Sequence, residues 1–314
     1  MAISITERVR HFPIIGRLFS PGGKIQVKGR PPALAQAILP PGPPSLAISD
    51  KIIGDRYTLG EPIGKGGLGH IYQGTDLKNN TPIVIKEIYH QDRPDLVQHE
   101  SMIGYWAAYG PNVHPNVARF LGLVNGPSGK PYQIFEYIPG QTLDSELQTR
   151  GPLTINETLM IMEQVCSALI YLRDQGIVHC DIKPNNILYD RAAGKATVID
   201  LGIAVATNNQ ALVGSPAFSP PEQLQKKAVD ERADIFAIGV TMYDLLSGTD
   251  LTENKAILQR NWKVRTKSFP AHLPDQLADL IIRMTHPNKQ NRSPNLETVL
   301  NELSALRQTP PLSN

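Results

Sequence analysis

The distribution of hydrophobic and polar positions divides the chain into a strand-like part and a helical part. Between residues 57 and 89, three stretches rich in β-branched and aromatic residues are separated by Gly and Asn-Asn turns: YTLGEPIG, HIYQGTDL and TPIVIKEIY. Such stretches are typical of β-strands. From there to about residue 307, helical patterns dominate. We therefore predict an α+β protein in which a small β-rich region precedes a larger, mainly helical one.

The clearest helix is predicted to begin after Thr154 and to end at Gly176. Thr154 and Glu157 have the spacing of a capping box, in which the Thr side chain accepts a backbone N–H and the Glu side chain reaches back. Apolar residues then recur every three or four positions on one helix face: Leu159, Met162, Cys166, Leu169 and Leu172. A later stretch, ADIFAIGVTMYDLLSG, is apolar nearly all round, which predicts a buried helix. Between the two, NILYD and ATVID flank RAAGK and predict a hairpin.

Residues 1–54 differ from the rest of the chain in composition. They contain eight of the 27 prolines and carry seven Lys or Arg residues against two acidic ones, a net charge of +5. Proline-rich sequence such as ILPPGPPSLA is extended and cannot continue a helix, so we predict a basic, mostly disordered leader. An alternative for ITERVRHFPIIGRLF is a short amphipathic anchor to a membrane surface or a partner, although Pro13 interrupts it.

Length, charge and cysteine content exclude several classes of protein. The 314 residues suffice for one large domain or two lobes, and a formal net charge of +2 gives no support for a nucleic-acid partner. With only two cysteines we expect no disulfide framework, which fits a reducing compartment. No run of 18 apolar residues and no signal peptide is present, so we expect a soluble, cytoplasmic protein without a transmembrane segment.

A glycine-rich stretch, GKGGLGHI, places Gly64, Gly66 and Gly69 in the pattern G-x-G-x-x-G. Glycine lets backbone amides approach phosphate oxygens closely. A dinucleotide fingerprint would continue into a helix, whereas here a strand-like segment follows, and no P-loop motif is present. The glycines are therefore predicted to lie in a hairpin between two strands. A phosphate-binding loop and an ordinary β-turn both remain open for this motif alone.

Two charged residues further along are expected to need partners. Lys86 ends the apolar strand IVIK, so its ammonium group is predicted to be at least half-buried and to require an anion nearby. Glu100 lies on the otherwise apolar stripe of a predicted helix that begins near Asp95. We therefore expect Lys86 and Glu100 to form an ion pair, with the alternative that both side chains reach solvent.

The loop HCDIKPNNIL brings Asp181, Lys183 and Asn186 into six residues, which is either a reaction centre or a well-capped bend. Together with Gly64/Gly66/Gly69, IVIK and Asp200-Leu-Gly, it resembles the motif set of eukaryotic-type (Hanks-type) serine/threonine protein kinases, in the same order. The resemblance extends from about residue 57 to residue 307. GSPAFSPPE is similar to the end of that family's activation segment, here residues 200–222. It is also similar in having Asp234 at the start of the buried helix and Arg292 where the family's Arg pairs with Glu222.

The resemblance implies a bilobal protein-kinase-like fold. The small β-rich N-lobe, with one main helix, would cover about residues 55–138, and the larger, mainly helical C-lobe about 139–308. Residues 1–54 would then be the leader and 309–314 a tail. The compact chain also suggests a bacterial enzyme by analogy.

The family's catalytic roles carry over to matching positions. By the resemblance, Asp181 accepts or orients the proton of the attacking hydroxyl and Lys183 supports the transferring phosphate. Lys86, fixed by Glu100, contacts the α- and β-phosphates of ATP. Asn186 and Asp200 hold Mg²⁺, with Mn²⁺ as an alternative. The implied nucleotide-binding positions are Ile63, Gly64, Lys65, Gly66, Gly67, Leu68, Gly69, His70, Ile71, Val84, Lys86, Phe135, Glu136, Ile138 and Leu188, with Ile199 as a further apolar wall.

The acceptor and the mode of activation follow from smaller features. Lys183 stands two residues after Asp181, and this spacing is similar to the pattern of serine/threonine protein kinases. Protein Ser and Thr hydroxyls are therefore the expected acceptors. A small-molecule phosphotransferase and a pseudokinase scaffold are the rival functions. Cys180 occupies the place of the family's Arg, and no charged residue lies between Asp200 and Glu222. We therefore expect activity not to depend on phosphorylation of the activation segment. The alternative is that lysines 226 and 227 bind the phosphate instead.

Overall fold

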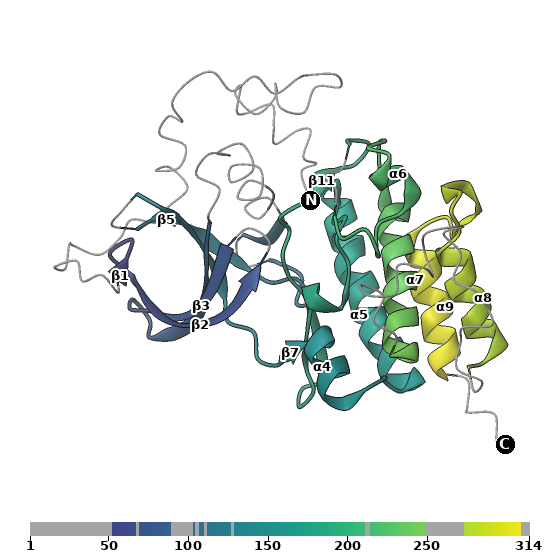
Figure 1. Ribbon diagram of the computed structural model, residues 1–314, viewed down its shortest axis with the longest axis horizontal. Helices are drawn as coiled ribbons and strands as arrows, with labels where there is room; N and C mark the ends of the chain where they lie inside the picture. Colours follow the sequence, from purple (N-terminus) through teal and green to yellow (C-terminus); the bar gives the residue numbers. More distant parts are fainter. Residues whose placement is uncertain are drawn as a thin grey trace. The chain divides into compact units, whose positions relative to one another are not determined.

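The computed structural model shows a β-rich unit and a mainly helical unit (Figure 1). The structure describes residues 52–66, 69–88, 103, 107–109, 112–126, 129–210, 214–248 and 273–308. The first unit holds the described residues up to Val113 together with Ala118–Ile138, and the second holds His114–Val117 and the residues from Pro139 onward. The predicted α+β, bilobal fold class is therefore confirmed. The N-terminal anchor, the helix near Asp95 and the tail lie outside the described residues.

The N-lobe contains a six-stranded antiparallel sheet in the order β1-β2-β3-β4-β6-β5. The strands are β1 (Ile52–Ile53), β2 (Tyr57–Gly66), β3 (Gly69–Asp76), β4 (Thr81–Glu87), β5 (Phe120–Asn125) and β6 (Pro131–Glu136). The three strands expected from sequence are β2, β3 and β4. One face of the sheet buries an apolar cluster that includes Ile83, Ile85 and Ile134. Because side chains alternate along a strand, Val84 and Lys86 of β4 lie on the opposite face from that cluster.

β1 departs from the expectation for the leader, which was predicted to extend to residue 54. Gly54 and Asp55 both have positive φ, 56° and 54°, and the Arg56 N–H donates to the Ile53 carbonyl at 3.3 Å, which closes a tight turn. The turn folds the preceding strand back onto β2, where Ile53 pairs with Tyr57 in the ladder. Arg56 then donates two hydrogen bonds to the Asp76 carboxylate, at 2.8 and 2.6 Å. Gly-Asp was the local signal for this turn, and the strand is too short to show a hydrophobic pattern.

The C-lobe is built from helices that lie side by side (Figure 1). They are α4 (Leu143–Arg150), α5 (Ile155–Asp174), α6 (Pro221–Leu224), α7 (Glu231–Ser247), α8 (Asp275–Met284) and α9 (Leu296–Gln308). The predicted capping box is present, since Thr154 and Glu157 exchange both hydrogen bonds at the start of α5. As expected, α7 is buried along nearly its whole length. No helix in the described part of the chain combines the length and apolarity needed to cross a bilayer.

Short strands and 3₁₀ turns complete the C-lobe and carry its loops. β9 (Ile187–Asp190) and β10 (Lys195–Val198) form the predicted antiparallel hairpin, and β7 (Gln141–Thr142) joins them as a third strand. β8 (Ile177–Val178) pairs with β11 (Val205–Ala206). The turns are η1 (Pro184–Asn186) and η3 (Lys289–Asn291). These elements place the loop between β8 and β9 against the segment that follows β10.

A buried ion pair connects the end of the activation segment with the loop before α9. Arg292 donates to both Glu222 carboxylate oxygens, at 2.6 and 2.9 Å, and its side chain is 0% exposed. The guanidinium also donates to backbone carbonyls of Arg232, His286 and Pro287. Nε makes one of these hydrogen bonds and Nη1 and Nη2 make two each, so all five N–H groups of the guanidinium have acceptors. The pairing predicted from sequence is confirmed.

The N-terminus of α7 provides a test of stability against pH. Burial alone would raise the pKa of Asp230, but hydrogen bonds from Arg232 and Lys289 lower this pKa well below its ordinary value. A lowered pKa stabilises the fold above the pKa of the unfolded state and loses that contribution as pH falls. We expect Asp230→Asn, which keeps a capping oxygen, to lower the free energy of unfolding at pH 7 by about 1 kcal/mol.

This deficit should shrink as pH falls below about 4, where the wild-type carboxylate of the unfolded chain takes up its proton. Urea unfolding from pH 7 to pH 3 measures it. The control is Asp275→Asn in the first turn of α8, where the exposed carboxylate has no ion-pair partner among the described residues. A deficit that stays constant over this range would contradict the assignment.

Candidate active site

The loop of residues 179–186, which we call the catalytic loop, is fixed to the start of α7 by one carboxylate. Asp234 is 2% exposed and accepts the backbone N–H groups of His179 and Cys180, at 2.9 and 2.8 Å. Burial raises the pKa of Asp234. The His179 ring in turn accepts the N–H of Asp181 through Nδ1 at 3.3 Å and lies 3.3 Å from the Ile199 carbonyl through Nε2. His179 is therefore a structural hydrogen-bonding residue beneath the loop.

Two side chains and one backbone N–H group donate to the Asp181 carboxylate. Lys183 Nζ and Asn186 Nδ2 both donate to Asp181 Oδ2, each at 2.8 Å. The backbone N–H of Ser215 donates to Oδ1 at 3.2 Å, and Lys183 Nζ also donates to Ser215 Oγ at 2.6 Å. The side chains of Asp181 and Lys183 are 14% and 20% exposed, so solvent still reaches them. The structure thus brings together the three loop residues singled out from sequence and adds Ser215 from the activation segment.

Asn186 and Asp200 lie at the same open end of the β9–β10 hairpin. Ile187 and Val198 are paired in the ladder, and the N–H of Ile199 donates to the Asn186 carbonyl at 2.9 Å. Asn186 therefore directly precedes one strand while Asp200 follows the other. The pairing register of the hairpin brings the two residues close, and a hairpin at this place was already predicted from sequence.

The chemistry of this pair fits a hard divalent cation. Both Nδ2 hydrogen bonds of Asn186 go to Asp181, so its Oδ1 is left as an acceptor among the described residues. Asp200 is partly exposed, and its Oδ1 accepts the N–H of Gly202 at 3.2 Å. Within the described residues, no cluster of three His, Cys, Asp or Glu side chains is suited to hold a metal. Two protein oxygens match Mg²⁺, which usually keeps waters and substrate phosphates as its other ligands.

The N-lobe candidates lie on β2, β3 and β4. Lys86 is 5% exposed and is paired with Ile71 in the β3–β4 ladder. Gly66 and Gly69 face each other across the predicted β2–β3 hairpin, and a Cβ on Gly69 would lie 1.5 Å from the Glu87 carbonyl oxygen. Only glycine fits there. Gly67, Leu68 and Glu100 lie outside the described residues, so the expected Lys86–Glu100 pair stays a prediction.

The remaining apolar candidates are distributed over both lobes. In the N-lobe, Phe135 is partly buried at the end of β6, with its ring edge-on to Phe120, and Glu136 accepts the N–H of Arg119. Ile63 is 51% exposed. The partly buried members are Ile71, Val84 and Ile138 in the N-lobe and Leu188 and Ile199 in the C-lobe. Partial exposure means that each has apolar surface available to a ligand.

Cys180, next to Asp181, lies in an apolar cluster. Its side chain is 3% exposed and packs with Val178, Val205, Val229 and Ala233. Burial raises the pKa of the Cys180 thiol well above its ordinary value, so the group is neutral at physiological pH. The cluster joins β8, β11 and the start of α7, and it contains no cation.

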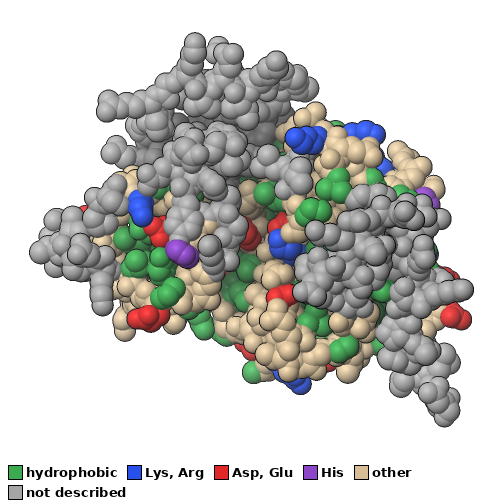
Figure 2. All heavy atoms as spheres, in the orientation of Figure 1, with side chains coloured by type: hydrophobic (Ala, Val, Ile, Leu, Met, Phe, Trp, Pro, Cys, Tyr) green, Lys and Arg blue, Asp and Glu red, His purple; other side chains and the backbone are tan. Residues whose placement is uncertain are grey.

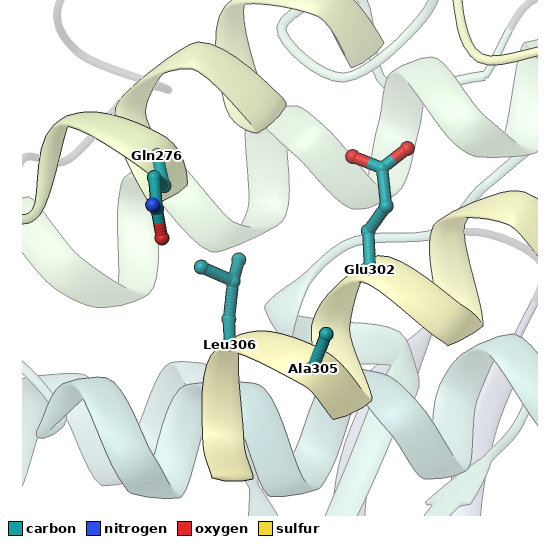
Figure 3. A pocket seen from close by; sticks show the side chains of 4 residues that line it. All are labelled: Gln276, Glu302, Ala305 and Leu306. Carbon is teal, nitrogen blue, oxygen red and sulfur yellow. The ribbon is translucent and has the colours of Figure 1, made fainter. Parts of the chain in front are cut away.

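Two other surface features of the C-lobe lack the combination of polar groups found at Asp181. A hollow between α8 and α9 is lined by Gln276, Glu302, Ala305 and Leu306, with the three α9 side chains rising toward α8 (Figure 3). Its one carboxylate pairs with Arg283, so it lacks a set of reactive groups.

Basic side chains gather at the α6 end of the lobe (Figure 2). Lys226 and Lys227 are exposed there and have no ion-pair partner among the described residues.

Sequence reasoning underrated three residues of the site. Asp234 had a signal, because a carboxylate opening an apolar helix needs buried donors. Ser215 lies in GSPAFSPPE, which sequence analysis identified only as the end of the activation segment, whereas its hydroxyl accepts a hydrogen bond from Lys183. Gln223, which donates to the Cys180 carbonyl at 2.7 Å, gave no signal.

Comparison with known proteins agrees with this arrangement. Residues 57–303 match the protein kinase domain model. A relative from Mycobacterium tuberculosis, the serine/threonine-protein kinase PknB, is 31% identical over 211 residues, 62% of this chain and 33% of its own. A probable serine/threonine-protein kinase PknB of Lactococcus lactis is 27% identical over 267 residues, 81% of this chain and 42% of its own. The chain thus spans about a third of the length of the mycobacterial relative.

The apolar surroundings of Cys180 can be tested by introducing a charge. We expect Cys180→Arg to lower the free energy of unfolding by about 3 kcal/mol, because the apolar cluster that surrounds the thiol has no room for the larger side chain without repacking. Cys180→Ala, which removes only the sulfur, should cost about 1 kcal/mol. Urea unfolding measures both. Equal stability of Cys180→Arg and wild type would show that the cluster accommodates a cation.

Proposed function

The chain belongs to the protein kinase domain family, and on that premise we propose that it transfers the γ-phosphoryl group of ATP to Ser and Thr hydroxyls of proteins. The observation that carries the proposal is the convergence of Lys183, Asn186 and Ser215 on the Asp181 carboxylate. This arrangement combines a proton acceptor, a cation and an amide in fixed positions. Phosphoryl transfer depends on such positioning and on electrostatic stabilisation.

In the proposed mechanism, Asp181 orients the acceptor hydroxyl and accepts its proton. Its Oδ2 is occupied by Lys183 and Asn186, and its Oδ1 receives one backbone N–H. These donors hold the carboxylate in one rotamer, and a general base must be positioned in this way. Lys183 lies beside it, where its ammonium group would balance negative charge that develops on the transferring phosphate.

Asn186 and Asp200 would hold the magnesium ion, through the Asn186 Oδ1 and the Asp200 carboxylate. When bound, the ion would neutralise charge on the phosphate oxygens. Mn²⁺ has the same preference for hard oxygen ligands and is the alternative. The register of the β9–β10 hairpin supports this assignment, because it fixes the two donors independently of a ligand.

For the N-lobe, we propose that Lys86 contacts the α- and β-phosphates and that the β2–β3 hairpin covers them. Lys86 is buried and therefore suited to bind an anion rather than bulk water. Gly66 and Gly69 pair at the end of this hairpin, so neither carries a side chain that would keep a phosphate away from the backbone amides. The adenine would be held by apolar surface from Ile71, Val84 and Phe135.

Two rival functions are less well supported. A pseudokinase scaffold would be expected to have lost at least one of Lys86, Asp181, Asn186 and Asp200, and all four are present. A small-molecule phosphotransferase would not need a peptide-docking segment, yet Ser215–Glu222 is anchored to the catalytic loop and to Arg292. The names of the mycobacterial and lactococcal relatives agree with a serine/threonine protein kinase. ATP as donor and two free cysteines fit a cytoplasmic location.

We further propose that activity does not require phosphorylation of the activation segment. Cys180 offers no guanidinium to a phosphate, and its neighbours form an apolar cluster. Backbone contacts already tie the segment down: Asn208 donates to the Val229 carbonyl, and Val229 donates to the Asn209 carbonyl. These contacts hold the segment without added charge. Phosphate binding by Lys226 and Lys227 is the alternative.

The catalytic proposal predicts that Asp181→Asn abolishes transfer while leaving nucleotide binding intact. The amide cannot accept the hydroxyl proton, so kcat should fall at least about a hundredfold. The measurement uses labelled ATP, Mg²⁺ and a generic basic protein, followed by identification of the labelled residue. Asp275→Asn is the matched control and should retain wild-type activity. Wild-type protein that binds nucleotide without labelling Ser or Thr would point to a scaffold.

The proposal on activation predicts that Thr207→Ala retains wild-type turnover, since Thr207 is the hydroxyl residue between Asp200 and Ser215. Phosphatase treatment should also leave the rate unchanged. The kcat of Ser215→Ala should fall roughly tenfold, because Lys183 loses a half-buried hydrogen-bond acceptor. Ser215→Thr, which keeps the hydroxyl, should retain activity. A tenfold loss in Thr207→Ala or after phosphatase treatment would refute independence from phosphorylation.

A further inference from the structure

The peptide unit that joins Cys180 to Asp181 is held from two sides. Its carbonyl accepts a hydrogen bond from Gln223 Nε2 at 2.7 Å, and its N–H, that of Asp181, donates to the His179 ring at 3.3 Å. The N–H of the preceding peptide unit, that of Cys180, donates to Asp234. Gln223 is 1% exposed and belongs to α6, which ends the activation segment. The amide side chain of Gln223 therefore connects α6 directly to the residue that precedes the proposed base.

Cys180 needs such a constraint because its backbone is strained. Its φ is 67°, a left-handed conformation that a residue with a side chain adopts at a cost. A strained residue keeps its conformation only where surrounding contacts fix both of its peptide groups. Rotation of the peptide unit between residues 180 and 181 would displace the Asp181 side chain. The hydrogen bond from Gln223 opposes that rotation.

The hydrogen bond between Gln223 and the Cys180 carbonyl is closely packed, and α6 holds Gln223 in place. A Cβ on Gly214 would lie 2.9 Å from the Cys180 carbonyl oxygen and 3.0 Å from Gln223 Nε2, so the segment passes directly over this bond. On the other side, the neighbouring Glu222 is locked by the buried ion pair with Arg292. Gln223 therefore cannot move away from the carbonyl without disturbing α6.

We propose that Gln223 is a positioning residue, which aligns Asp181 for phosphoryl transfer through the Cys180 carbonyl and so links the activation segment to the catalytic loop without a phosphate. The inference rests on the proposed kinase function and adds a specific residue to it. Gln223 supplies a neutral donor at a place where Cys180 supplies no cation. The resulting link is permanent, because an amide neither titrates nor depends on a modifying enzyme.

The charges around this bond make a pH test informative. The titratable groups that influence the Cys180 environment are Asp181, Glu222, Asp234 and His179, with Glu222 paired to Arg292. The Glu carboxyl group introduced at position 223 would be buried near these carboxylates, and both burial and like charge favour its protonated form. The protonated fraction then increases as pH falls. Protonated, it donates to the carbonyl; ionised, it repels the carbonyl.

The experiment compares Gln223→Met, which keeps the length but has no donor, with Gln223→Glu in the full chain. We expect kcat of Gln223→Met to fall roughly tenfold with little change in KM for ATP, the effect of losing one buried hydrogen bond that acts on alignment. Relative to wild type, that deficit should not vary between pH 6 and pH 8.5. The relative kcat of Gln223→Glu should rise as pH falls over the same range.

The outcomes separate this inference from the function on which it rests. Wild-type kcat in a folded Gln223→Met, judged by nucleotide binding and thermal unfolding, would overturn the positioning role. A relative kcat of Gln223→Glu that does not change with pH would overturn it too, since a purely steric role is independent of protonation. Wild-type protein that transfers no phosphate to Ser or Thr would instead refute the proposed function itself.

Discussion

The catalytic loop depends on a single buried carboxylate. Asp234 places two acceptor oxygens under consecutive N–H groups, those of His179 and Cys180, and is itself held in the first turn of α7. Burial opposes ionisation of this carboxyl, whereas the two donors and the N-terminus of the helix favour it. Because α7 is buried along nearly its whole length, its position is set by packing, and the loop takes its position from α7.

From that support the C-lobe site is assembled mainly by the backbone. Asp181 is oriented by its own N–H on the His179 ring and by the N–H of Ser215, and Asn186 meets residue 199 through hairpin pairing. Main-chain contacts of this kind survive many side-chain changes. They explain how a neutral Cys180 is accommodated beside the proposed base: the loop is held by amides and carbonyls, so a cation at that position is not needed for its shape.

Sequence patterns predicted the local features and missed those formed over long separations. The capping box at Thr154, the buried helix α7 and both hairpins depend on neighbouring residues, so their signals are contained in short stretches. Ser215 and Gln223 contact the catalytic loop across 34 and 43 residues. A serine and a glutamine have no periodicity or spacing that indicates a distant partner. The resemblance to a kinase supplied the order of the site residues, while these linking contacts came only from the fold.

The same contrast bears on how the activation segment is held. A phosphate on a flexible segment adds charge that must find a cation, and the resulting contact can be removed enzymatically. In this chain the segment is instead held by packing of Val205 in the apolar cluster, by backbone pairing of residues 208–209 with Val229, and at its end by the Glu222–Arg292 pair. Burial of apolar surface and of a paired charge is present whenever the chain is folded. A segment fixed in this way is in place without a covalent modification, which is the physical basis of the proposed independence from phosphorylation.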